Sequence, residues 1–262
     1  MKTVFKVSLF ELENLLSKKI VCISTAGYAL TCFVICISRN LRYSYFSITE
    51  SVPVSLNNFI LPIVLILILA GSLTPVFAGD KEQGIEQIPA TCLIGSKGRS
   101  IAKIISATLF SVFMVILLET ITFALCFSSD LFDTAIPIRY VGTEVKLQPI
   151  WTAGEHTVFS ISVLTIGCII LSILILFISC ICKNTLSAVS LTCIFLLIEF
   201  VIHKFSFPTL LQEYNIWIFF RPYYLFTTEI INISPYANFL ILLVAFLPIY
   251  VFVIYGIVKN GT

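Results

Sequence analysis

Residues 157–182 read TVFSISVLTIGCIILSILILFISCIC and contain no charged side chain between His156 and Lys183. A helix needs about 20 apolar residues to cross the hydrocarbon core of a bilayer, and this stretch is long enough. It lacks the polar–apolar alternation of a membrane β-strand, and backbone groups in hydrocarbon must be paired within the segment. The stretch therefore predicts a transmembrane helix, and it indicates the fold class of the whole chain.

Five further apolar stretches follow the same rule, although two of them continue past a single glutamate. The six predicted spans cover about residues 20–38, 56–78, 103–126, 158–181, 185–202 and 237–258. We therefore expect an all-α integral membrane protein with six transmembrane helices. Little more than Cys182–Lys183–Asn184 joins the fourth and fifth spans, so these two helices are predicted to form a tight hairpin.

The composition excludes several classes of protein. Of the 262 residues, 58% are hydrophobic and 11% are charged, and the mean hydropathy is +1.04. A soluble domain usually has about 25% charged residues, so a soluble enzyme and a disordered chain are both excluded. The net charge of +2 is too small for a phosphate-binding surface, so we expect no nucleic-acid partner.

The distribution of basic residues predicts the orientation of the chain in the membrane. Six spans place both termini on one side, and with the termini inside, the internal segments hold ten lysines and arginines against six outside. The internal ones are Lys2, Lys6, Lys18, Lys19, Lys81, Lys97, Arg99, Lys103, Lys183 and Lys259. The positive-inside rule then favours cytoplasmic termini. The external segments are 39–55, 127–157 and 203–236, and the last, rich in aromatic residues, is expected to contain one or two short re-entrant helices.

Residues 1–19 precede the first span and have the pattern of an amphipathic helix. One helical face carries the apolar residues Phe5, Leu9, Leu12 and Leu16. We expect this segment to lie on the inner membrane surface as an interfacial helix, with an ordinary frayed tail as the alternative. Residues 20–262 are then a single six-helix transmembrane domain.

The loop 80–103, between the second and third spans, is the longest and most polar of the internal segments. It opens with a charged and amide-rich run, namely Asp80, Lys81, Glu82, Gln83, Glu86 and Gln87. Gly95, Ser96 and Gly98 predict a turn, after which Lys97, Arg99 and Lys103 line the start of the next span. The loop is either a solvated connector or a short helix, carried on two membrane helices, against which an intracellular partner pushes.

Two carboxylates lie within the predicted spans, Glu119 and Glu199. Acids within a membrane are costly and are candidates for function. Their positions place both in the outer half of the bilayer, where water and headgroups are near. Each is therefore either paired or hydrogen-bonded at a helix end or part of a polar translocation route, and Glu199 has His203 one helical turn further on as a partner.

Catalytic and metal-binding motifs do not stand out in the sequence. It contains no G-x-S-x-G, H-E-x-x-H, P-loop lysine or G-x-G-x-x-G pattern, and His156 and His203 lie in separate segments. Most of the nine cysteines lie in or beside apolar runs, where they act as small packing residues. We therefore predict no catalytic residues, no metal site and no enzymatic activity in this chain.

This arrangement resembles the membrane-spanning (permease) subunit of an ABC exporter of the type-2 permease family. The resemblance covers the architecture of the whole chain and is most specific in the inner loop. There the family typically shows an acidic residue, a glycine often followed by threonine, a basic turn, and a lysine that opens the third span. The corresponding residues here are Asp80 or Glu82, Gly84, the turn Gly95–Arg99, and Ala102–Lys103. The chain departs from the pattern at Ile85, where threonine is usual, and at Pro89, which lies early.

The resemblance implies that the 80–103 loop docks on a separate ATP-binding subunit, which binds the ATP and Mg because this chain has no nucleotide motif. It also implies a second permease subunit, in a homodimer or heterodimer, and alternating access with spans two and five lining the route. The residues it assigns to docking are Asp80, Glu82, Gly84, Glu86 and Gln87, with Lys97, Arg99 and Lys103 anchoring the loop at the inner surface.

The expected function is therefore ATP-driven export of a peptide, antibiotic or lipid-like substrate across a bacterial plasma membrane, with antimicrobial peptide resistance as a special case. Membrane lipid is the expected surrounding. One alternative is a six-helix ion channel or ion-coupled carrier that uses Glu119 or Glu199 as its ion site. A membrane-embedded enzyme or assembly factor is the third hypothesis.

Overall fold

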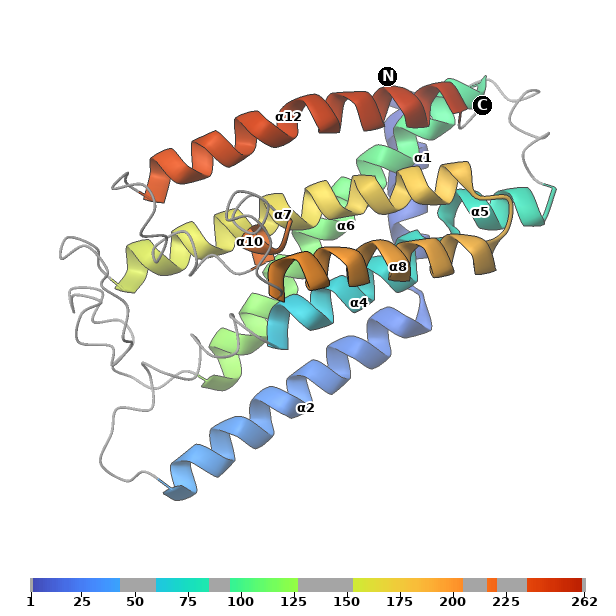
Figure 1. The fold of residues 1–262 in the computed structure, drawn as a ribbon. Helices are drawn as coiled ribbons and strands as arrows, with labels where there is room; N and C mark the ends of the chain where they lie inside the picture. The colour runs from blue at the N-terminus through green and yellow to red at the C-terminus, as the bar shows by residue number, and fades with distance from the viewer. Residues whose placement is uncertain are drawn as a thin grey trace.

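The computed structural model describes residues 2–42, 60–84, 95–126, 153–204, 216–220 and 235–260. Within these ranges the elements are all helices: α1 (Lys2–Leu16), α2 (Lys19–Arg42), α4 (Leu61–Leu73), α5 (Pro75–Glu82), α6 (Gly95–Cys126), α7 (Ala153–Ile181), α8 (Thr185–Lys204), α10 (Trp217–Phe220) and α12 (Pro235–Asn260). Figure 1 shows the long helices side by side in a bundle. The all-α fold predicted from the sequence is confirmed for these residues.

Five helical stretches of the described chain have the length and hydropathy of membrane spans. They are Leu61–Glu82, Gly95–Leu125, Val158–Ile181, Thr185–Ile202 and Phe239–Lys259. A sixth is present if α1 and α2, which meet at a bend of 57°, are taken as one span. The chain therefore has the architecture of a multi-pass helical membrane protein with five or six spans among the residues described.

Helix α6 extends beyond the predicted start of the third span. Helix α6 begins at Gly95 rather than near residue 103, so the turn predicted at Gly95–Arg99 is wrong. Gly95 itself has a φ of +63°, a left-handed conformation that glycine adopts at no steric cost. Hydropathy marks only the apolar part of a helix, and the backbone hydrogen bonds of α6 continue beyond it through polar residues.

The second predicted span is a helix divided in two. Helix α4 ends at Leu73, and α5 begins at Pro75 after the single residue Thr74. Proline has no N–H to donate and is tolerated in the first turn of a helix, which explains why the break lies here. The fourth and fifth spans form the tight hairpin that was predicted, because α7 ends at Ile181 and α8 begins at Thr185.

Helices α4 and α7 form the centre of the bundle, and α8 and α12 lie at its edge. In the most apolar 18 residues of each span, 61% are buried in the α4–α5 span and in α7, against 11% in α8 and 17% in α12. Close approach of the central helices is helped by small and hydroxyl residues, such as the contact between Ser111 of α6 and Ser172 of α7. The outer helices present most of their apolar side chains outward, as a lipid-facing helix does.

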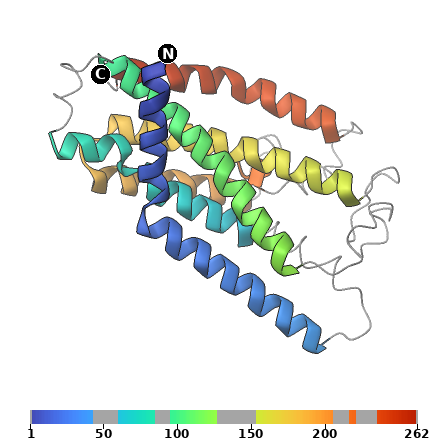
Figure 2. The ribbon, with the colours of Figure 1, turned by 180° about the vertical axis from the view of Figure 1, so that it is seen from behind.

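Helix α1 crosses α6 near one end of the bundle, as Figure 2 shows from behind. Its inward face differs from the apolar face predicted from the sequence. Ser8 and Leu15 are buried, whereas Phe5 and Leu9 are exposed, together with Phe10. The segment is therefore a helix, as predicted, but half of its apolar stripe points away from the bundle.

One end of the bundle collects the segments that the sequence assigned to the inside. In Figures 1 and 2 the labels N and C lie close together, at the end that also holds α5 and the turn between α7 and α8. We call this end the basic end, because the ten lysines and arginines assigned to internal segments all belong to elements that meet there. Of the predicted external segments, residues 43–55, 127–152, 205–215 and 221–234 lie outside the described residues.

Candidate functional site

The two ends of the predicted docking loop lie in the described chain, and its middle does not. Asp80, Glu82 and Gly84 are at or just beyond the end of α5, and Lys97, Arg99 and Lys103 are in the first turns of α6. Glu86 and Gln87 lie outside the described residues. The site described below is therefore built from the two helix ends and from what they contact.

Asp80 joins the two ends of the loop through ion pairs. Its carboxylate lies 2.8 Å from the guanidinium of Arg99 and also accepts a hydrogen bond from the Lys103 ammonium. The side chain of Lys103 is only 2% exposed, whereas those of Asp80 and Arg99 are about a quarter exposed. A lysine this deeply buried requires a counter-charge, and Asp80 provides it.

The remaining contacts of Lys103 come from α5. Its ammonium donates to the Val76 carbonyl oxygen at 2.6 Å and lies 4.3 Å from the centre of the Phe77 ring. The cation–π contact and the carbonyl bond compensate for much of the hydration that burial removes. One lysine of α6 therefore holds the start of α6 against most of the length of α5.

Lys18, in the bend between α1 and α2, extends the same group of charges. Its ammonium donates to the Ser72 carbonyl oxygen near the end of α4. Burial lowers the pKa of Lys18, while the neighbouring carboxylate of Glu11 acts to raise it. Glu11 also attracts Lys103, so charges from α1, the α1–α2 bend, α5 and α6 converge at the basic end.

Lys81 and Glu82, the last two residues of α5, contact the hairpin between α7 and α8. The Lys81 ammonium donates to the Cys180 carbonyl oxygen in the last turn of α7. The Glu82 carboxylate accepts from the backbone N–H of Thr185 at 3.1 Å, and from its hydroxyl, at the first residue of α8. The positive group thus meets a helix C-terminus and the negative group a helix N-terminus, which matches both helix dipoles.

Ser179 of α7 stabilises the break between α4 and α5. Its hydroxyl accepts from the backbone N–H groups of Phe77 and Ala78, both at 3.0 Å, and donates to the Thr74 carbonyl oxygen at 2.6 Å. These are the backbone groups that lose regular partners where Pro75 interrupts the helix. A serine from another helix therefore provides the N-terminal cap of α5.

The exposed residues of the loop ends differ from the paired ones, except that Glu82 is both exposed and paired. Glu82, Gln83, Gly84 and Lys97 are exposed, and Gly84 has a φ of +66°, which favours glycine after the end of a helix. The sequence assigned Asp80 and Glu82 alike to docking and Arg99 to anchoring. The structure pairs Asp80 with Arg99 and Lys103, and it joins Glu82 to Thr185 of its own chain.

Glu119 belongs to a buried polar cluster between α6 and α2. It is 4% exposed and lies one helical turn before Thr122, whose hydroxyl is hydrogen-bonded to the Tyr28 hydroxyl of α2 at 2.6 Å. Cys32 also neighbours the Tyr28 hydroxyl. Polar side chains that pair across two helices are a common way of stabilising membrane bundles, so this cluster joins α2 to α6.

Glu199 faces a different part of the bundle from Glu119. Its carboxylate has the backbone N–H of Ile216, the residue directly before α10, as a hydrogen-bond donor. The side chains of α10 are packed against α7 and α12, with Phe219 against Phe239 and Phe246. The prediction of a short helix in 203–236 is confirmed by α10, and the side chain of His203 lies outside the described residues.

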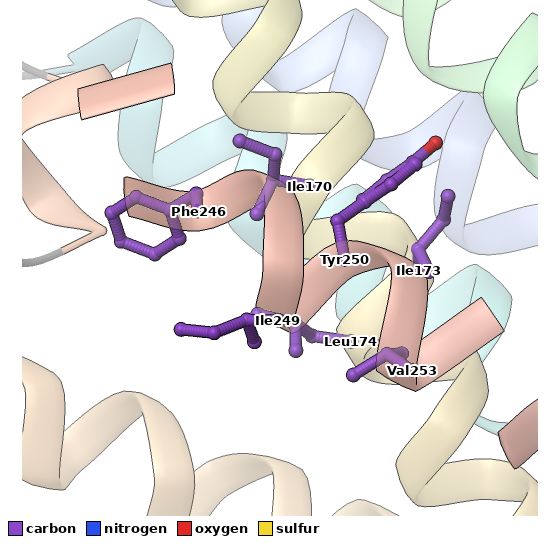
Figure 3. Close-up of a pocket in the computed structure, with 7 residues that line it drawn as sticks. All are labelled: Ile170, Ile173, Leu174, Phe246, Ile249, Tyr250 and Val253. Carbon is purple, nitrogen blue, oxygen red and sulfur yellow. The ribbon is translucent and has the colours of Figure 1, made fainter. Parts of the chain in front are cut away.

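A small apolar crevice lies between α7 and α12. Figure 3 shows it lined by Ile170, Ile173 and Leu174 of α7 and by Phe246, Ile249, Tyr250 and Val253 of α12. Its volume of about 10 Å³ is the space of a single water molecule. This crevice is too small for a peptide or an antibiotic, so it defines no substrate site in this conformation.

Sequence reasoning missed four residues that join helices in the structure, namely Lys18, Tyr28, Lys81 and Ser179. Pro75 after Thr74 signals a helix break, but nothing in one sequence indicates which distant hydroxyl caps it. Across the described residues, no group of three or more His, Cys, Asp or Glu side chains could hold a metal ion. The bonds described here join the two ends of the loop to each other and to α7 and α8.

Comparison with known proteins assigns no family to this arrangement. No protein-family model matches the chain, and no curated protein matches its sequence.

Proposed function

We propose that this chain is the permease subunit of an ATP-driven ABC exporter, with its basic end in the cytoplasm. The observation that carries the proposal is the Asp80 bridge to Arg99 and Lys103, which fixes both ends of the 80–103 loop to the same point of the bundle. A loop held in this way can receive a push from a partner without bending away. The displacement then reaches α5 and α6 together.

The orientation follows from the position of the charges. The elements of the basic end contain the ten internal lysines and arginines, and cytoplasmic segments are those that carry such an excess. With this end inside, Phe5, Leu9 and Phe10 of α1 are available to the inner leaflet, and α1 serves as an interfacial helix. We place the protein in a bacterial plasma membrane on the basis of the family resemblance.

The proposed partner subunits supply the ATP-binding site and the second half of the translocation route. ATP and Mg would be bound by a separate cassette subunit, because the sequence contains no phosphate-binding motif. A second permease subunit, identical or homologous, would complete the translocation route. The substrate class that best fits an apolar, aromatic membrane domain is a peptide, an antibiotic or a lipid-like molecule.

The test is co-expression of the chain with a cassette ATPase encoded next to its gene, followed by purification and reconstitution in proteoliposomes. We expect a stable complex whose ATP hydrolysis depends on the permease. The matched variants are Lys97→Glu, on the exposed side of the loop, and Lys259→Glu, on the exposed end of α12. We expect the first to weaken the complex and the second to leave it unchanged.

Two outcomes would contradict the proposal. Ion or solute flux through the chain alone in liposomes, without any ATPase, would indicate the channel or carrier alternative. A complex that hydrolyses ATP equally well with and without the permease would exclude a coupled role for it.

A further inference from the structure

The end of α5 is attached to the α7–α8 hairpin by contacts of two kinds. Lys81 and Glu82 bond to the last turn of α7 and the first residue of α8, respectively. Gly79 lies three residues before Glu82, and a Cβ there would be in ordinary van der Waals contact with the Thr185 hydroxyl oxygen, at 3.8 Å. Helix α5 therefore packs directly on the start of α8 as well as on α7.

The hairpin itself has little freedom of its own. Only Cys182, Lys183 and Asn184 separate the two helices, and Asn184 already caps α8 by accepting from the Ser187 N–H at 2.8 Å. Glu82 accepts from the Thr185 N–H, and Lys81 donates to the Cys180 carbonyl oxygen in the last turn of α7. Both ends of the three-residue link are thus bonded to two adjacent residues of α5.

We propose that Lys81 and Glu82 form a clamp that makes the α7–α8 hairpin follow α5. A displacement of the 80–103 loop is then delivered to the fourth and fifth spans as well as to α6. Lys81 and Glu82 are positioning residues in this proposal, since they act through the ends of α7 and α8. The clamp itself is independent of the proposed exporter function, while its role in transport rests on that function.

The clamp can be tested by exchanging its two charges, which leaves the amino-acid composition and net charge of the chain unchanged. Exchanging the pair, Lys81→Glu with Glu82→Lys, places an acid at the C-terminus of α7 and a base at the N-terminus of α8. Both electrostatic contacts change from favourable to unfavourable. The control exchange is Lys6→Glu with Glu13→Lys, two exposed residues of α1, which also leaves the net charge unaltered.

The first measurement is amide hydrogen exchange of residues 181–188 in the purified full chain in lipid nanodiscs. We expect the exchanged pair to raise exchange of these amides roughly tenfold, because exchange reports the free energy of local opening. The control pair and Lys81→Arg, which keeps the positive donor, should retain the protection of the parent chain. Unchanged protection in the exchanged pair would overturn the clamp.

The second measurement is the number of substrate molecules transported per ATP hydrolysed by the reconstituted complex with the cassette ATPase. We expect this ratio to fall at least severalfold in the exchanged pair and to stay at the parent value in the control pair. A ratio that does not change, in a variant whose hairpin exchanges faster, would overturn the transport role of the clamp. Failure of every cassette protein to bind the parent chain would overturn the exporter proposal, while the exchange measurement would still decide the clamp.

Discussion

At the residue scale, the decisive feature is a lysine that is nearly removed from solvent. Lys103 has three kinds of partner, namely the carboxylate of Asp80, the carbonyl oxygen of Val76 and the ring of Phe77. Of these, only Asp80 carries the opposite charge. An uncompensated buried ammonium is far more costly than the loss of an exposed ion pair, so the pair matters chiefly through the penalty for breaking it.

Asp80→Asn should lower the stability of the folded chain by about 3 kcal/mol, because it leaves Lys103 buried without its counter-charge. The double variant Asp80→Asn with Lys103→Met should recover most of this loss, since it removes the charge that needs compensation. Thermal unfolding in detergent measures both, with Lys97→Met as the control at an exposed lysine. A double variant that is no more stable than Asp80→Asn would contradict this account.

At the element scale, the bundle depends on helices that complete one another's ends. Helix α5 receives its N-terminal cap from Ser179 of α7, and it provides caps for the ends of α7 and α8 in return. The Ile216 N–H, directly before α10, has the Glu199 carboxylate of α8 as its acceptor. The backbone groups at the break between α4 and α5 are buried away from water, so they need a partner such as Ser179 from a neighbouring element.

Ser179→Ala should destabilise the chain by about 2 kcal/mol, because it leaves the Phe77 and Ala78 N–H groups buried without their acceptor. The matched control is Ser162→Ala in the same helix, where the exposed hydroxyl bonds only to the Val158 carbonyl. Thermal unfolding gives the stability, and hydrogen exchange should rise over residues 75–80 in the first variant alone. Equal behaviour of the two variants would exclude the capping role.

Gly167→Ala should displace α10 from α7. A Cβ at Gly167 would overlap the Cβ of Phe219 and also come within 3.4 Å of its backbone, which cannot move aside as a flexible side chain would. We expect a loss of about 2 kcal/mol from overpacking.

The fluorescence emission maximum of Trp217, measured in a Trp151→Phe background, should shift to longer wavelength as α10 moves into more polar surroundings. Gly27→Ala is the control for the added methyl group, because no atom lies within 4 Å of a Cβ there. A Gly167→Ala variant with the parent emission would show that α10 is not seated on this glycine.

At the scale of the whole molecule, the described chain gathers one group of paired charges at the basic end and turns many apolar side chains to the outside of the bundle. The apolar stretches of α8 and α12 are mostly unburied, so their side chains face outward. The charged groups of α1, α5 and α6 meet at the basic end. This separation is expected of a protein whose flanks face lipid and whose end faces water. It fixes which loops a soluble partner can reach.

Single cysteines introduced at Lys97 and Lys183 should both be accessible only from the cytoplasmic side. Membrane-impermeant maleimide should label them in inside-out vesicles and not in intact cells, over the background of the parent chain. Lys97 lies in the first turn of α6 and Lys183 in the link between α7 and α8, both at the basic end, so the two positions must behave alike. Labelling of either from outside the cell would contradict the orientation and the proposed docking of an ATPase.

Much of the fold could be predicted from the sequence, whereas the candidate site could be predicted only as a list of members. The spans, the tight hairpin and the short helix in 203–236 follow from apolar runs and their interruptions. The sequence indicated four of the residues of the site, Asp80, Glu82, Arg99 and Lys103. It assigned them to docking and anchoring, and it did not predict that they pair with one another or with the α7–α8 hairpin. Pairing depends on which helix ends meet, and a single sequence does not contain that information.

The sequence by itself determined that the chain is helical, where its apolar segments run and which segments carry the basic residues, because transfer of a side chain into lipid is a property of the local sequence. Only the tertiary structure decided that Ser179 caps a helix about one hundred positions earlier, and that Glu82 bonds to Thr185 at a similar separation. It also decided that Ser8 rather than Phe5 faces the bundle. The physical reason is that hydrogen bonds and ion pairs act over a few ångströms, so their partners are chosen by the packing of whole helices.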